Sequence, residues 1–245
     1  MKRKKRSKQR IVVSGKTVEW FQYSKPYFYD GESSRIDYTK NNADKREDAL
    51  ARTQTQLREL IWCNVKEDTV PRFYTFTFRD PIDDLQVANK LWGQFRRRLK
   101  KLIPDIQYIS VVEFQNKRQE KYGKGAWHYH VLFFNMPEEI HKNELQAYKK
   151  RLSGEEVNGV IANIWRNGFI DVSPTKTNIT AIRSVAAYVS KYLSKQTFDN
   201  RLKGQKVFFR SQNLQEPKVY HEHDIISNPQ LIHTLIPQQH SDMVY

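Results

Sequence analysis

The stretch that decides the fold is Trp127-His-Tyr-His-Val-Leu-Phe-Phe134, a mostly apolar run that contains two histidines. Such a run is typical of a buried β-strand, in which successive side chains point to opposite faces. His128 and His130 therefore share one face, and Tyr129 and Val131 share the other. Buried imidazoles are costly unless hydrogen bonds or a metal ion satisfy them. A plainer interpretation is one edge-strand histidine bonded to a carbonyl and a second facing water.

A second strand, predicted over residues 107–114, precedes this run and is separated from it by a polar loop, 115–126. The two strands are expected to form a long hairpin. Glu113 lies in an apolar context, so it needs a partner, and the hairpin can bring it beside the two histidines. Two histidines and one carboxylate suit Mn²⁺ and tolerate Mg²⁺ or Zn²⁺. A salt bridge from Glu113 to a basic residue of the loop is the alternative.

The flanking sequence predicts a mixed α+β protein. An alternating aromatic and threonine strand spans 72–78, with Tyr74, Phe76 and Phe78 on one face. Asp83 and Asp84 are placed to cap a helix that follows. The order of these patterns predicts an α+β sandwich with an antiparallel sheet. The remaining predicted elements are helices over 43–64, 85–102, 138–152, 155–165 and 179–195, and a strand over 169–172.

The composition points to a polyanionic partner. The net charge is +15, and the sequence pI is near 9.7. Seven basic residues lie in the first ten, which leaves +8 for the rest of the chain. A basic body as well as a basic arm favours nucleic acid, with a membrane surface as the weaker candidate. Cys63 is the single cysteine, which excludes an internal disulfide framework. Without an apolar span or signal peptide, we expect a cytoplasmic protein.

Two groups of cations are candidates for DNA contact, although a solvated face explains such runs equally well. One lies on the helix over 85–102, and the other lies in the loop of the hairpin. Their members are Arg96, Arg97, Lys100 and Lys101 on the helix, and Lys117, Arg118, Lys121 and Lys124 in the loop.

The predicted helix over 179–195 carries two tyrosines one turn apart, Tyr188 and Tyr192, with Lys191 and Lys195 beside them. Packing of tyrosines and lysines at the edge of an amphipathic helix is the plain interpretation. The chemical interpretation is a nucleophilic tyrosine. Because a phenol is mostly protonated at neutral pH, it attacks a phosphodiester only with help from a metal ion or a cation.

These motifs, in this order, resemble the HUH endonuclease superfamily, and specifically the rolling-circle replication initiators of plasmids and small phages. The three motifs are Phe73-Tyr-Thr-Phe-Thr-Phe78, Trp127-His-Tyr-His-Val-Leu132 and Tyr188-Val-Ser-Lys-Tyr-Leu-Ser-Lys195. The resemblance implies a ferredoxin-like or RRM-like antiparallel sheet with helices packed on one face. It also implies that His128, His130 and Glu113 bind Mn²⁺ or Mg²⁺. Tyr192, in a Lys-Tyr-x-x-Lys frame, is favoured narrowly over Tyr188 as the nucleophile.

By the same resemblance the chain is an endodeoxyribonuclease and strand transferase. It nicks and joins single-stranded or hairpin origin DNA through a 5′-phosphotyrosyl link, and host helicase and DNA polymerase are its expected partners. No phosphate-binding loop suggests a helicase within the chain. The expected organisation is a basic arm over 1–42, the endonuclease domain over 43–198 and a C-terminal extension over 199–245.

Three alternatives remain open. A non-catalytic module would bind RNA or single-stranded DNA by stacking bases on Tyr74, Phe76 and Phe78. A transposase or a relaxase of the same superfamily is the second. The third concerns His221 and His223, which align on a strand if one forms there; a solvated C-terminal segment is preferred to a second metal site.

Overall fold

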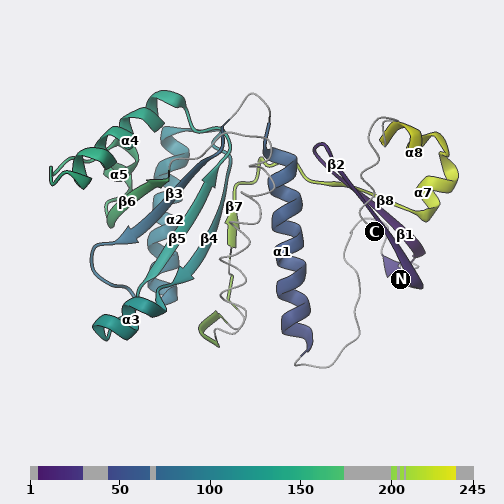
Figure 1. Ribbon diagram of the computed structural model, residues 1–245, viewed down its shortest axis with the longest axis horizontal. Coiled ribbons are helices and arrows are strands. Elements are labelled where there is room, and N and C mark those ends of the chain that lie inside the picture. The colour runs from purple at the N-terminus through teal and green to yellow at the C-terminus, as the bar shows by residue number, and fades with distance from the viewer. Residues whose placement is uncertain are drawn as a thin grey trace.

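The computed structural model (Figure 1) describes residues 5–29, 44–66, 70–173, 200–202, 205–206 and 208–235. These residues form two antiparallel sheets, and helix α1 (Asp44–Asn64) stands between them. The chain is therefore an α+β protein with antiparallel sheets, as the order of its sequence patterns predicts.

The larger sheet has five strands, and every neighbouring pair in it is antiparallel. The predicted strand over 72–78 and the predicted hairpin form its centre. The short strand β7 joins its edge from the segment that was expected to be a C-terminal extension. In spatial order the strands are β6 (Gly168–Ser173), β3 (Arg72–Phe78), β5 (Trp127–Phe133), β4 (Tyr108–Phe114) and β7 (Phe208–Arg210).

Helix α2 (Leu85–Leu102) covers one face of this sheet. Its first turn is capped as predicted, because Asp84 Oδ1 accepts the backbone N–H groups of Gln86 at 2.7 Å and Val87 at 3.3 Å. Trp92 of α2 stacks on Tyr129 with ring centroids 4.5 Å apart. Tyr129 lies between the two histidines in sequence, so this packing fixes the strand that carries them. The core on this side also contains Tyr74, Phe76, Phe78, Phe95, Phe133, Trp165 and Ile170.

Helix α1 packs on one end of the opposite face. Its buried residues Leu57, Leu60 and Ile61 contact Phe73, Ile109, Val111, Leu132 and Phe134 of the sheet. The two histidines belong to this same face, since they alternate with Trp127, Tyr129 and Val131 along β5. The sheet therefore separates an aromatic core under α2 from a face that combines α1 with the polar cluster.

Helix α4 (Glu138–Leu152) begins and ends where the sequence predicts, but the next helix does not. Residues 155–165 were expected to be helical, whereas α5 spans only Val160–Trp165. The reason is its N-terminal cap. Glu144 Oε2 accepts the N–H groups of Ile161 at 2.8 Å and Ala162 at 3.2 Å. A Cβ on Gly159 would lie 2.3 Å from that oxygen, so glycine is needed there.

The polar segment between β4 and β5 was expected to be a loop and is in part a helix, α3 (Asn116–Tyr122). Its residues are mostly good helix formers. Gly123 ends the helix with φ of 70°, and its N–H donates to Gln119 O at 2.9 Å. The cations of the predicted loop are therefore presented largely on a short helix at the tip of the hairpin.

The smaller sheet joins the two ends of the chain. Strands β1 (Lys5–Ser14) and β2 (Thr17–Tyr29) form a hairpin, and β8 (Lys218–His221) pairs antiparallel with β1. This hairpin also contacts α1, since Arg58 donates to Glu19 Oε1 at 2.7 Å. Two short helices, α7 (Glu222–Ser227) and α8 (Gln230–Leu235), follow β8.

The expected alignment of His221 and His223 on one strand is wrong. Strand β8 ends at His221 and α7 begins at the next residue, so His223 lies on a helix and is exposed. His221 is buried rather than solvated. Its Nδ1 lies 2.6 Å from Tyr27 Oη, and its ring stacks on Tyr29 at 3.7 Å between centroids. The pair is therefore divided between a core contact and the surface.

The predicted helix over 179–195 lies outside the described residues, and with it Tyr188, Lys191, Tyr192 and Lys195. Among the helices that are described, none combines the length and the apolarity needed to cross a lipid bilayer.

Candidate active site

Three neighbouring strands bring the predicted metal ligands together on one face. In the register of the sheet, His128 lies between Thr77 of β3 and Glu113 of β4. His130 lies in the adjacent row, between Thr75 and Val111. The prediction that Glu113 and the two histidines share a face of the hairpin is confirmed by this register.

Hydrogen bonding within the cluster is diagonal as well as lateral. Although Glu113 is paired with His128 in register, its Oε2 lies 2.7 Å from Nε2 of His130. Thr75 Oγ1 lies 3.1 Å from Nδ1 of the same ring. Because a carboxylate only accepts, Nε2 of His130 carries a proton that it donates to Glu113. In the neutral ring the Thr75 hydroxyl then donates to Nδ1.

His128 is held more loosely. Its Nδ1 accepts from Gln115 Nε2 at 3.2 Å, and Thr77 Oγ1 lies 3.4 Å from the same nitrogen. Both imidazoles are buried, with 6% of each residue exposed. Burial lowers the pKa of His128 to about 4, and nearby His130 and Arg118 lower it further against the opposing effect of Glu113. His128 is therefore neutral at pH 7, the state in which imidazole binds a cation.

The chemistry of these donors fits a divalent metal ion. They offer two imidazole nitrogens and a carboxylate on one face, and a hydroxyl supports Nδ1 of each ring as outer partners of metal-bound histidines do. No three His, Cys, Asp or Glu side chains within the described ranges surround a common point, however. The atoms that would bind the ion, Nε2 of His130 and Oε2 of Glu113, are instead bonded to each other. Metal binding would require this hydrogen bond to open.

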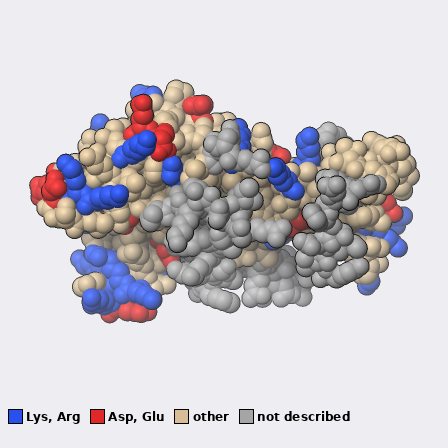
Figure 2. Space-filling view, turned by 45° about the horizontal axis from the view of Figure 1, so that its top comes forward, with Lys and Arg blue, Asp and Glu red and all other residues tan. Residues whose placement is uncertain are grey.

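Helix α3 places the hairpin cations next to the cluster. Arg118 is close enough to lower the pKa of His128, and Gln115 immediately precedes the helix. Figure 2 shows these cations as a blue group at the lower left of the view. Its members are Lys117, Arg118, Lys121 and Lys124.

Sequence analysis missed Tyr122, which is 62% exposed at the end of α3. Its ring lies under the side chains of Arg118 at 5.6 Å and Lys121 at 5.0 Å. The signal was present, because Tyr122 is the single aromatic residue in an otherwise polar and basic segment. An exposed ring flanked by cations is a suitable surface for stacking a base beside a phosphate.

A residue beyond the tyrosine-bearing segment holds α3 in place. The guanidinium of Arg201, in the single turn η1 (Asn200–Leu202), lies 3.6 Å from the ring centroid of Phe114 and donates to Asn116 Oδ1 at 2.6 Å. The chain therefore returns to the tip of the hairpin directly after residues 174–199.

The other predicted DNA-binding cations do not lie near the histidines. Arg96, Arg97, Lys100 and Lys101 belong to α2, on the opposite side of the sheet. The structure thus divides the predicted basic surface between two layers of the molecule.

The base-stacking surface expected for a non-catalytic binding module is covered. Tyr74, Phe76 and Phe78 are at most 4% exposed, because α2 packs over them. Stacking bases on this strand would require removing the helix, so the main argument for that alternative fails.

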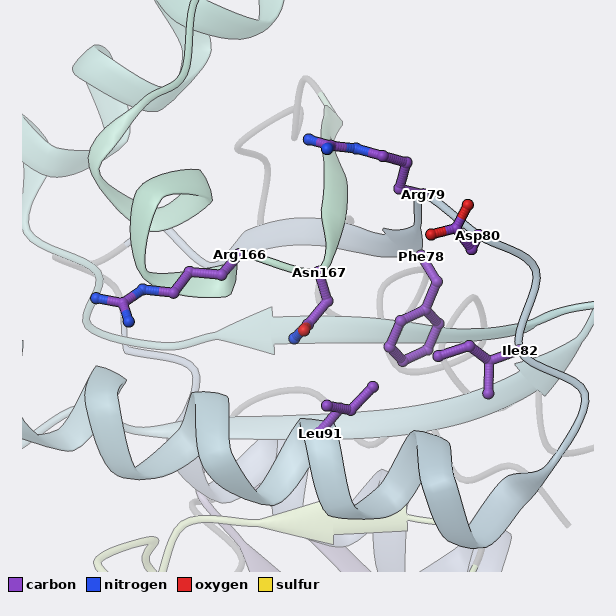
Figure 3. Close-up of a pocket in the computed structure, with 7 residues that line it drawn as sticks. All are labelled: Phe78, Arg79, Asp80, Ile82, Leu91, Arg166 and Asn167. Atoms are coloured by element: carbon purple, nitrogen blue, oxygen red, sulfur yellow. The ribbon is translucent and has the colours of Figure 1, made fainter.

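A small cavity of about 250 Å³ lies where β3 ends and β6 begins (Figure 3). Phe78, Ile82 and Leu91 line its apolar side, and the side chain of Asn167 points toward Leu91. Arg79 and Arg166 extend away from this apolar side, so the cavity itself is weakly charged. The histidines do not line it.

Fold and cluster together define a basic α+β protein with a His–His–carboxylate group on one face of an antiparallel sheet. The model of the replication-associated protein ORF2 family matches residues 71–197, slightly more than half of the chain, and the chain belongs to this family. The match spans β3, the cluster and the segment with both tyrosines. This membership assigns the chain to DNA replication and is consistent with a rolling-circle type of initiator. Comparisons with curated proteins and with solved structures gave no match.

Proposed function

We propose that this protein initiates rolling-circle replication by cutting and rejoining single-stranded or hairpin origin DNA. The observation that carries the proposal is the cluster of Glu113, His128 and His130 on one buried face, with threonine hydroxyls at both imidazoles. Family membership supports a replication role for the same residues. A structural core has no need of a carboxylate bonded to a histidine pair.

In this proposal Glu113, His128 and His130 hold Mn²⁺ or Mg²⁺. A bound divalent ion supplies Lewis-acid polarisation of the scissile phosphate. The phenol oxygen of Tyr192, or of Tyr188, attacks the phosphorus and loses its proton. The bond from phosphorus to the 3′ oxygen breaks, and that oxygen takes up a proton to become a free 3′-OH.

The DNA then carries a 5′-phosphotyrosyl link, and the free 3′-OH primes a host polymerase. Attack of a 3′-OH on the link reverses the chemistry, so joining needs no ATP. Lys191 and Lys195 steady the phosphate on the tyrosine. The cations of α3 hold the neighbouring backbone, and Tyr122 offers a stacking surface for an unpaired base.

The test is covalent capture. The full-length protein is incubated with Mn²⁺ and a pool of labelled single-stranded and hairpin oligonucleotides, and the products are separated on a denaturing SDS gel. We expect an SDS-resistant adduct with the natural chain that is lost in His128→Ala. His223→Ala is the matched control, because this histidine is exposed and remote from the cluster. Tyr188→Phe and Tyr192→Phe then identify the nucleophile.

An adduct in His128→Ala equal to that of the natural chain would exclude the metal role of this residue. Binding without any adduct across the whole pool would contradict the cleavage mechanism and favour a binding module.

A further inference from the structure

A strongly basic groove lies on the α2 side of the sheet, between α2 and the segment that carries β7. Its volume is about 770 Å³. Five cations and no acidic side chain line it in the described part of the chain: Arg96, Arg97, Lys100, Lys206 and Arg210. Three come from the predicted basic helix, and two come from more than a hundred residues further along the sequence.

Packing holds like charges together in this groove. Arg96 and Lys206 both lie over the ring of Phe209, at 4.9 Å and 5.2 Å from its centroid. The Nε–H group of Arg96 is buried and has no hydrogen-bond partner among the described residues. Gathering cations around one ring is unfavourable in the free protein. An anion in the groove would relieve this repulsion and provide an acceptor for Arg96.

The groove is too far from the histidines to hold the same piece of DNA. Phe209 packs in the aromatic core with Tyr129, on the face opposite to His128 and His130. The groove also lies at the other end of the hairpin. Tyr108 lines it, whereas Glu113 is five residues further along β4, or about 17 Å at the rise of a β-strand. A strand at the cluster therefore leaves the groove free.

The lining favours a phosphate backbone over unpaired bases. Proteins that bind single strands stack bases on exposed aromatic rings. Tyr108 is the one aromatic side chain lining the groove within the described residues, and it is buried. The rest of the surface offers cations and the polar side chains of Ser211, Gln212 and Asn213. Such groups contact phosphate and sugar, whose spacing is regular in a duplex.

We propose that this groove binds the phosphodiester backbone of a second DNA segment, a duplex, while the cluster on the opposite face acts on a single strand. The inference goes beyond the cleavage proposal. Duplex binding at the groove requires neither a metal ion nor a tyrosine, so it stands or falls on its own measurement.

The test compares two variants of the full chain with equal changes in charge. Lys100→Gln/Lys206→Gln removes two groove cations, and Lys90→Gln/Lys101→Gln removes two exposed lysines of α2 that do not line the groove. All four side chains are exposed, so folding is preserved, which urea unfolding verifies. The affinity for a short fluorescent duplex without unpaired bases, and for a matching single strand, is measured by anisotropy from about 50 to 200 mM salt.

We expect the groove variant to bind the duplex about tenfold more weakly, with a slope of log K against log salt that is smaller by roughly 1.8, because two phosphate contacts are lost. The control variant and single-strand binding should change little. The proposal is overturned if both variants weaken duplex binding equally, if single-strand binding falls as much as duplex binding, or if the natural chain does not bind the duplex. Adduct formation plays no part in this readout, so failure of the cleavage proposal is recognised separately.

Discussion

The hydroxyl of Thr75 should control how well His130 binds a metal ion. In the metal-free cluster Nε2–H of His130 donates to Glu113, and the Thr75 hydroxyl donates to Nδ1 at 3.1 Å. If Nε2 is to bind an ion, the proton must move to Nδ1, and the hydroxyl must then accept it. A hydroxyl can do both. Valine has the same shape and can do neither, so Thr75→Val leaves a buried N–H unsatisfied in the metal-bound state.

The expected cost follows from that lost acceptor. A buried, unsatisfied donor costs about 1–3 kcal/mol, and outer partners of metal-bound histidines are worth about 10- to 100-fold in affinity. Thr77→Val should cost less. Thr77 lies 3.4 Å from Nδ1 of His128, and Gln115 gives that nitrogen a second partner at 3.2 Å. The expected order of Mn²⁺ affinity is natural chain, then Thr77→Val, then Thr75→Val.

Isothermal titration of the DNA-free protein with Mn²⁺ measures this order without reference to cleavage. Thr234→Val is the matched control, because its hydroxyl bonds only within α8, to Gln230 O at 3.0 Å. An equal loss in Thr75→Val and Thr77→Val, or no loss in either while His130→Ala abolishes binding, would refute the reasoning from the proton position.

Three further predictions concern stability. Removing the α2 cap in Asp84→Ala should lower the free energy of unfolding by about 0.5–2 kcal/mol, whereas Asp83→Ala, whose side chain is exposed, should change it little; urea denaturation compares the two. Gly93→Ala should stabilise α2 by about 0.5–1 kcal/mol, because the nearest atom to a new Cβ is 3.8 Å away; a loss of stability in the same assay would contradict this. Burial, opposed by Asp224, lowers the pKa of His221. The unfolded chain therefore binds a proton more readily at this site, and stability should fall as the pH drops below the ordinary histidine pKa of about 6.5. This dependence should weaken in His221→Gln, as urea midpoints at several pH values would reveal.

Local patterns predict much of the central sheet. Alternation in 72–78 and in the histidine run fixes both strand type and facing side chains, and the register then requires Glu113 to lie beside His128. The cap at Asp84 is equally local. None of these features needs information from distant parts of the chain, because strand periodicity and capping depend on neighbouring residues.

Features that depend on distant segments could not be predicted. Strand β8 pairs with β1 across about two hundred residues, with Val12 opposite Val219, and a polar tetrapeptide carries no sign of its partner. The burial of His221 follows from this pairing. Likewise, Lys206 and Arg210 are unremarkable in sequence and become part of a groove only because β7 joins β4. The diagonal bond from Glu113 to His130 depends on side-chain torsions that periodicity does not describe.

The layered arrangement explains why a tyrosine stands between the histidines. Tyr129 points away from the cluster, stacks on Trp92 at 4.5 Å and donates its hydroxyl hydrogen to Asn89 Oδ1 at 2.7 Å. A large ring fixed on both its face and its hydroxyl restricts the backbone at the centre of the His-x-His pair. The imidazoles on the other face are thereby held in position without contacts of their own to α2. Rigid support from the opposite layer is what a preorganised site requires. The same core ring, through Phe209, meets the floor of the basic groove, so both proposed DNA-contacting surfaces are built on one aromatic core.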